Sequence, residues 1–298
     1  MTTATFNLHK MHVQHTNPIQ YQLNKITLNN LLNKKLTLEW NGEINCIQCN
    51  RKIKQSFQQG FCFPCMQKIN ECNNCMIHPE KCLVETSNKI CDPNHWAHQH
   101  CHQKQIVYLA NSSGLKVGVT QIKNNPSRWI DQGAVQALPI FETTNRYQAG
   151  LIEVALKNYV ADKTNWRVML RENVAHIDLI QERNNLLLLA QKRGREAACE
   201  INIPQKRGRE AACEINIPQK RGREAACESS DQIILLNDDN VLTFNYPILA
   251  YPTKINSLSF DKTSKIEGIL LGIKGQYLIF DTGVLNIRKF SGYSITLC

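Results

Sequence analysis

The chain has 298 residues, of which 42% are hydrophobic and 20% are charged; these proportions exclude global disorder and fibrous repeats, and the length allows two domains. Lysine and arginine total 35 against 25 acidic residues, a formal net charge of +10 that favours an anionic partner. The unusual number is the 13 cysteines, nine of which lie between Cys46 and Cys101.

The first 20 residues contain three histidines and no continuous apolar stretch, so they do not resemble a signal peptide. The longest uncharged aliphatic run, at residues 186–190, is far below the roughly 18 to 20 residues of a membrane-spanning helix. We therefore predict a cytoplasmic protein with no membrane contact. In that reducing compartment, paired thiols are more often metal ligands than disulfides.

Stretches rich in β-forming residues occur at residues 16–45 and again at 232–298. Asn41-Gly42 marks a turn in the first stretch, and glycines divide the second. We predict an α+β fold in which these two regions pair into one discontinuous β-rich domain, with the rest of the chain inserted between them.

The Cys-rich block at residues 46–102 contains two C-x2-C pairs separated by 12 residues. Two such knuckles place four thiolates at tetrahedral spacing, and residues 51–60 are long enough to form a hairpin that folds one knuckle over the other. The block has few aliphatic residues, so a metal must supply the stability that apolar burial cannot. We predict a zinc ribbon with the ligands Cys46, Cys49, Cys62 and Cys65.

Five further cysteines follow in the same block, beginning with a third C-x2-C pair. We predict a second structural zinc, held by Cys72, Cys75, Cys82 and Cys91. Cys101 can replace either of the last two ligands. Four thiolates also suit an iron–sulfur cluster, so the spacing leaves the identity of this second metal open.

Residues 105–175 have the pattern of a small α/β module. Two strand-like runs, 106–110 and 115–120, flank a polar turn and predict a hairpin. A short helix is predicted over 126–132 and a strand over 137–143. A second helix is predicted over 147–161, where apolar residues recur at i, i+3, i+4, i+7 and i+8.

A tandem repeat occupies residues 191–228. The sequence QKRGREAACEINIP stands at 191–204 and, unchanged, at 205–218, and a third copy begins at 219. Solenoid repeats are usually longer, about 20 to 50 residues, and vary in sequence. We therefore predict a duplicated surface insertion in a loop or disordered conformation. Its cysteines, Cys199, Cys213 and Cys227, are predicted to bind no metal.

The central module resembles the core of GIY-YIG nucleases over residues 105–165. The resemblance is carried by Ile106-Val107-Tyr108, by Lys116-Val117-Gly118-Val119-Thr120, by Arg128, and by Glu153 on the later helix. Ile106 stands where the family has the first glycine, and Lys116 stands where it has the tyrosine of the second motif. In that superfamily, a three-stranded sheet with flanking helices presents a tyrosine, an arginine and a metal-binding glutamate.

This resemblance implies phosphodiester hydrolysis, which needs a nucleophilic water, a cation that offsets charge in the transition state and usually a divalent metal. Tyr108, assisted by Lys116, would orient or deprotonate the water. Arg128 would contact phosphate oxygens, and Glu153 would hold one Mg2+ or Mn2+. A structural alternative stays open for each: packing at the sheet edge for Tyr108, a solvated helix charge for Arg128, and a surface pair of Glu153 with Lys157.

Four longer phrases are similar to domain-of-unknown-function family 2797. They are QGFCFPC at 59–65, PEKC at 79–82, RWIDQGA at 128–134 and GIKGQYL at 272–278. The resemblance covers nearly the whole chain except the repeat. It implies a shared architecture rather than a reaction.

Zinc ribbons and GIY-YIG-like modules commonly meet nucleic acids. The last region also alternates basic and aromatic residues, including Lys274, Phe280, Arg288 and Phe290. On an exposed sheet face such residues would stack bases and neutralise phosphates; in the alternative, the aromatic side chains point into the core. We predict a zinc protein that binds DNA or RNA through a metal-dependent endonuclease module or a silent derivative of one. The alternative is a non-catalytic, zinc-stabilised scaffold that binds a protein partner.

Overall fold

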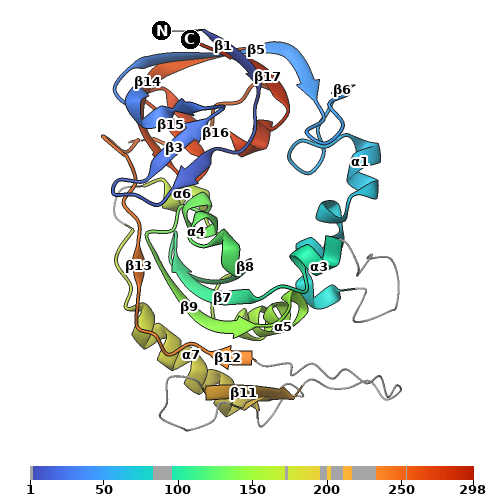
Figure 1. The fold of residues 1–298 in the computed structure, drawn as a ribbon. Helices are drawn as coiled ribbons and strands as arrows, with labels where there is room; N and C mark the ends of the chain where they lie inside the picture. Colours follow the sequence, from blue (N-terminus) through green and yellow to red (C-terminus); the bar gives the residue numbers. More distant parts are fainter. Residues whose placement is uncertain are drawn as a thin grey trace.

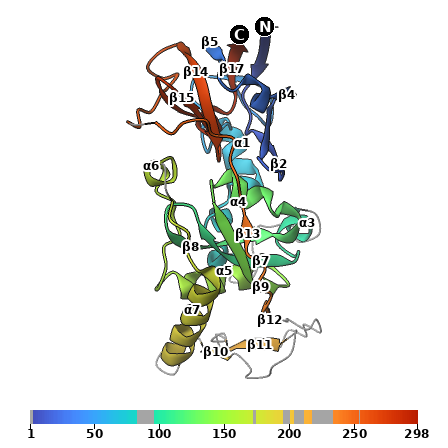
Figure 2. The same ribbon diagram turned by 90° about the vertical axis from the view of Figure 1, so that its left-hand side faces the viewer.

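The computed structural model describes residues 3–82, 96–171, 174–194, 200–202, 211–216, 233–252 and 254–298 (Figure 1 and Figure 2). These residues form several sheets and short helices, which is the mixed composition that the α+β prediction requires. No helix among them is long and apolar enough to cross a membrane.

Segments from both ends of the chain pair in one antiparallel sheet, seen at the top of Figure 1. Its strand order is β1-β17-β5-β14-β15-β16, and β6 pairs with the end of β5. The strands are β1 (Ala4–Asn7), β5 (Lys35–Asn45), β6 (Lys52–Ile53), β14 (Lys265–Lys274), β15 (Tyr277–Phe280), β16 (Gly283–Asn286) and β17 (Tyr293–Leu297). In β5, Leu36 and Leu38 are buried between more exposed neighbours, so one face of the sheet points to the core.

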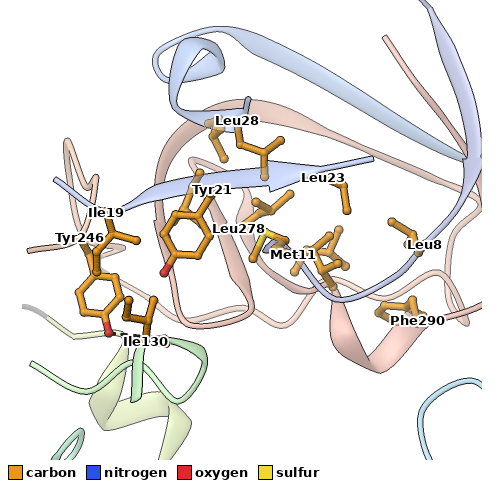
Figure 3. Packing of buried hydrophobic residues seen from close by; sticks show 14 of the residues in the cluster. Leu8, Met11, Ile19, Tyr21, Leu23, Leu28, Ile130, Tyr246, Leu278 and Phe290 are labelled. Carbon is orange, nitrogen blue, oxygen red and sulfur yellow. Dashed lines mark hydrogen bonds between the residues drawn. The ribbon is translucent and has the colours of Figure 1, made fainter. Parts of the chain in front are cut away.

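A small N-terminal sheet covers this core. It consists of β2 (His12–Gln14), β3 (Gln20–Leu23) and β4 (Ile26–Thr27), followed by the 3-10 turn η1 (Leu28–Leu31). Figure 3 shows Tyr21 and Leu23 of this sheet on the side of Leu278 of β15, and Leu8, which precedes the sheet, beside Phe290 of the 3-10 turn η6 (Arg288–Phe290). The labelled residues of the N-terminal segment are Leu8, Met11, Ile19, Tyr21, Leu23 and Leu28.

The central module forms a second sheet. β7 (Gln105–Asn111) and β8 (Leu115–Gln121) form the predicted hairpin, in which Tyr108 lies opposite Gly118. The predicted third strand is β9 (Gln136–Thr143), which pairs with the other side of β7. The middle strand β7 is therefore buried along its whole length.

Both predicted helices of the module form. They are α4 (Ser127–Asp131), which follows the 3-10 turn η5 (Ile122–Asn124), and α5 (Arg146–Leu156). The prediction extended α5 to residue 161, but the helix ends earlier because Ala161 bridges to β8 and accepts the Val117 N–H at 3.0 Å. Two further helices, α6 (Trp166–Met169) and α7 (Leu179–Gly194), follow, and α7 packs Leu179 and Leu186 against the second sheet.

The described parts of the repeat extend the second sheet instead of forming a loop. β10 (Glu200–Asn202) pairs with β11 (Ala211–Asn216), and β11 pairs with β12 (Ile233–Leu235). Pairing satisfies the backbone groups that the edge of β12 would otherwise leave open. β12 and β13 (Leu242–Thr243) pair with β9, so this stretch differs from its predicted place in the β-rich domain. The thiols of Cys199, Cys213 and Cys227 lie outside the described part of the structure.

The Cys-rich segment runs along one side of the molecule from the first sheet to α5 (Figure 1). Its helical turns are α1 (Phe63–Lys68), η2 (Asn70–Cys72), η3 (Asn74–Met76), η4 (Pro79–Lys81) and α3 (Trp96–His100). At its far end η4 packs against α5, where a Cβ on Gly150 would lie 2.5 Å from the Pro79 side chain. The segment therefore contacts both sheets.

One hydrophobic cluster joins the two sheets. It includes Leu278 and Ile287 from the first sheet region together with Tyr108, Trp129 and Ile130 from the module. Figure 3 shows Ile130 beside Tyr246, whose hydroxyl donates to the Ala134 carbonyl at 2.6 Å. This shared core fixes α4 against the first sheet.

Candidate functional site

The first C-x2-C pair lies in the turn that follows β5. The N–H of Cys46 donates to the Arg51 carbonyl at 2.9 Å, and the carbonyl of Cys46 accepts the Asn50 N–H at 2.8 Å. The second pair begins α1, where Cys62 is the N-cap and its sulfur accepts the Cys65 N–H at 3.4 Å. A closed turn and a helix N-terminus thus bring the two pairs together.

The sulfur atoms of the four predicted ligands, Cys46, Cys49, Cys62 and Cys65, all lie within 4.8 Å of one another. The Cys49 Sγ to Cys62 Sγ distance is 3.8 Å, and tetrahedral coordination with Zn–S bonds of about 2.3 Å requires a separation of about 3.8 Å. Cys46 and Cys62 are buried, and Cys49 is exposed at the rim. The cluster fits one zinc ion.

The pKa shifts of these thiols also favour a bound cation. Burial opposes ionisation of Cys46, but the N–H groups of Cys49, Cys62 and Gln48 outweigh it and lower the pKa of that thiol to about 6. A hydrogen bond with Cys62, burial and the neighbouring thiols raise the pKa of Cys65 to about 12. A bound Zn2+ removes this conflict because it stabilises all four thiolates at once.

Four more described cysteines lie at or beside the short helical turns: Cys72, Cys75, Cys82 and Cys101. Burial and then the charge of Cys82 raise the pKa of Cys75, and both Cys75 and Cys101 act on the guanidinium of Arg146. Burial, then the charge of Glu71 and last that of Cys46 in the first cluster, raise the pKa of Cys72. Cys91 lies outside the described residues, and within them the first cluster is the one group of three or more ligands close enough for a metal.

A polar cluster in the module is centred on Tyr108 in β7. The ring of Tyr108 lies against Gly118, where a Cβ would come within 2.6 Å of the hydroxyl oxygen. The hydroxyl donates to Gln132 Oε1 at 3.0 Å. Burial raises the pKa of Tyr108, although the charge of Arg128 opposes the shift. The hydroxyl therefore stays protonated at neutral pH.

Lys116 enters the same cluster from β8 and is only 3% exposed. Its Nζ donates to Gln132 Oε1 at 2.5 Å and to Thr164 Oγ1 at 2.9 Å. Burial, followed by the positive charge of Arg128, lowers the pKa of Lys116 to about 7, against the opposing charge of Glu153. A substantial fraction of this lysine is therefore neutral at physiological pH.

The other two predicted residues lie near this pair. The charges of Arg128 on α4 and Glu153 on α5 both act on Tyr108 and Lys116. Glu153 is 13% exposed, and burial raises the pKa of its carboxyl against the influence of Lys157. Its oxygen lies 3.8 Å from Lys157 Nζ, so the surface pair that was the structural alternative is also present.

Sequence reasoning assigned no role to two residues of this region, Gln132 and Arg146. Gln132 accepts hydrogen bonds from Tyr108 and Lys116 on one oxygen. Its position in the RWIDQGA phrase, one helical turn after Arg128, could have indicated that it lies in the same cluster. The Arg146 guanidinium donates to the Met76 carbonyl at 2.9 Å and ties α5 to the Cys-rich segment. The sequence around Arg146 does not predict that contact.

The basic and aromatic residues of the last region do not form the exposed base-stacking face. Phe280, Phe290 and Lys274 are each 1% exposed, so they fit the core alternative. Arg288, in contrast, is half-buried on η6.

The sequence profile of one family, described as "Protein of unknown function (DUF2797)", matches residues 33–295. No curated protein and no solved structure matches the chain. The resemblance to GIY-YIG nucleases is not confirmed by these comparisons and stays a hypothesis. The matched range includes the four-cysteine cluster, the polar cluster and strands from both halves of the first sheet. The chain therefore belongs to the DUF2797 family.

Proposed function

We propose that this zinc-binding protein holds a nucleic-acid phosphodiester at the polar cluster of its α/β module and hydrolyses it with one divalent metal ion. The observation that carries the proposal is that Tyr108 and Lys116 both donate hydrogen bonds to Gln132 Oε1. The charges of Arg128 and Glu153 influence both donors. The guanidinium of Arg128 has no carboxylate partner within 4.0 Å among the described residues, and an anion would offset its charge. A bound phosphate supplies that anion.

Each side chain has a task in this hydrolysis. The oxygen of a water attacks phosphorus while the bond from phosphorus to the leaving oxygen breaks, and that oxygen then takes up a proton. Lys116, with its pKa near 7, has the neutral amine needed to accept the proton of the attacking water. Tyr108 stays protonated and helps to hold Gln132, while Arg128 donates to phosphate oxygens.

Glu153 is the proposed ligand of one Mg2+ or Mn2+, which would polarise the phosphate oxygens. Burial raises the pKa of its carboxyl, and the charges of Asp162 and Glu80 raise it further against Lys157 and Arg146. A divalent cation at Glu153 would relieve this repulsion among carboxylates.

The zinc ion in the first cluster is structural in this proposal, because four thiolates leave no coordination position for substrate. A second zinc held by Cys72, Cys75, Cys82 and Cys91, with Cys101 able to replace either of the last two, stays a proposal, because Cys75, Cys82 and Cys101 alone are not close enough to hold a metal. Metal analysis tests this proposal. We expect two zinc ions per chain, one of them lost in Cys75→Ser; a single zinc in the wild type would refute the second site.

One observation favours the alternative, a non-catalytic scaffold for a protein partner. Tyr108 and Lys116 are 1% and 3% exposed, respectively. Side chains this inaccessible also suit a purely structural polar core. Under that alternative, substitutions in the cluster change stability but no reaction.

The test incubates zinc-loaded protein with labelled DNA and RNA, single- and double-stranded, at two salt concentrations. We expect binding that weakens as salt rises and cleavage that requires Mg2+ or Mn2+. Glu153→Gln should abolish cleavage with the zinc content unchanged, whereas the exposed Glu39→Gln on β5 should cleave like the wild type. Absence of salt-dependent binding to every substrate would refute the proposal, and binding without cleavage would restrict it to a silent derivative.

A further inference from the structure

Arg288 is a half-buried arginine that the polar cluster as described so far does not include. It lies on η6, between β16 and β17 of the first sheet. In the part of the chain that the structure describes, neither Arg288 nor Arg128 has a carboxylate within the 4.0 Å of an ion pair. Fully buried cations have such partners, and a half-buried cation without one still loses part of its hydration.

Hydrogen bonds through Gln276 link the two segments that carry these arginines. The side chain of Gln276 donates to Asp131 Oδ1 at 2.9 Å, and Asp131 lies three residues after Arg128 on α4. The carbonyl of Gln276 accepts the N–H of Ile287 at 2.9 Å, and Ile287 directly precedes Arg288. The two guanidinium groups thus project from segments joined across the two sheets.

The positive charge of Arg128 also influences the neighbouring cations. Burial lowers the pKa of Arg288, and the positive charge of Arg128 lowers it further, against the influence of Asp131. Arg128 has the same effect on Lys116 and on Arg146. Cations from both sides of the junction therefore repel one another around Arg128.

We propose that Arg288 and Arg128 bind phosphate groups of one nucleic-acid strand, which crosses the junction between the first sheet and the α/β module. This inference rests on the proposed function and adds a binding residue from the first sheet. A guanidinium donates two parallel hydrogen bonds to phosphate oxygens, which suits this task. Ile130 and Phe290, each two positions from one of these arginines, belong to the same hydrophobic cluster, at whose opposite ends they lie in Figure 3.

The test compares Arg288→Gln with Lys289→Gln, which removes the same charge from the next residue. Lys289 is 56% exposed and already pairs with Asp261 at 3.1 Å. Fluorescence anisotropy with labelled DNA and RNA over a salt series should show about tenfold weaker binding for Arg288→Gln. The slope of log K against log salt should also fall by about one. Lys289→Gln should stay within about twofold of the wild type. Equal binding by Arg288→Gln and the wild type would overturn the inference while the proposed function stands.

A second arm uses inorganic phosphate at constant ionic strength and measures the melting temperature. Phosphate should stabilise the wild type and Lys289→Gln but not Arg288→Gln. If nucleic acid fails to bind and phosphate still stabilises through Arg288, the anion site stands and the proposed function fails; if neither binds, both fail. Zinc content and circular dichroism check the fold. Should Arg288→Gln not fold, Arg288→Lys replaces it, with weaker binding expected because the two-pronged contact is lost.

Discussion

Lys116 should make the stability of the protein depend on pH in a range where exposed lysines have no effect. Its pKa is about 7 in the folded protein, against an ordinary value of 10.5 in the unfolded chain. Between these values the unfolded state binds more protons, so the free energy of unfolding rises with pH. The contribution is complete above about pH 10.5 and is lost as the pH falls towards 7.

The expected size follows from the pKa shift. One pH unit corresponds to about 1.4 kcal/mol, and Lys116 is half-protonated in the folded state at pH 7, so the interval from pH 7 to 9 contributes about 2 kcal/mol. Lys116→Met keeps most of the side-chain length and removes the titrating group. The free energy of unfolding of the wild type minus that of Lys116→Met should therefore rise by about 2 kcal/mol over this interval.

Urea unfolding of zinc-loaded protein at pH 7, 8 and 9 measures this difference. Groups that both proteins share, including the zinc ligands, cancel in the subtraction. Lys123→Met, at an exposed position on η5, is the matched control and should give parallel curves. A difference between wild type and Lys116→Met that stays constant within about 0.5 kcal/mol would refute the burial argument.

Three further predictions concern the zinc cluster, the cluster around Tyr108 and the junction. Cys62→Ser should remove one zinc per chain and lower the melting temperature, whereas the exposed Cys298→Ser should do neither; metal analysis showing unchanged zinc would contradict the ligand assignment. Gly118→Ala places a Cβ 2.6 Å from the Tyr108 hydroxyl and should cost about 1–3 kcal/mol in urea unfolding. Wild-type stability in that variant would show that the ring moves freely. Gln276→Leu breaks the hydrogen bonds that join the two sheets, and we expect a loss of about 1–3 kcal/mol by the same assay, with no measurable loss counting against the junction.

The local features were predictable because short-range chemistry encodes them. The two C-x2-C pairs define turns that position their own sulfurs, so the first cluster follows from spacing alone. The hairpin of β7 and β8 follows from a polar turn between two strand-like runs. In both cases the interacting residues come from neighbouring segments of the chain.

The joining of distant segments was not predictable from one sequence. Gln276 and Asp131 are separated by 145 positions, and no periodicity or composition links them. The repeat strand β11 pairs with β12, and β12 in turn pairs with β9, so the place of β11 depends on two strands outside the repeat. Such contacts depend on how the sheets assemble, so a pattern read along the chain does not reveal them.

The case for an anionic partner therefore rests on local arrangement more than on net charge. The formal charge of +10 counts all cysteines as neutral, whereas a zinc ion with four thiolates carries about −2. Three cations, Lys116, Arg128 and Arg288, lie at the junction. Burial and the positive charge of Arg128 lower the pKa values of Lys116 and Arg288. The proposed role as base requires Lys116 to keep its neutral amine when the phosphodiester and the divalent metal are bound, so binding near pH 7 to 8 should take up no proton at this side chain. Calorimetry in two buffers of different ionisation enthalpy measures proton uptake, and uptake that disappears in Lys116→Met would exclude Lys116 as the base.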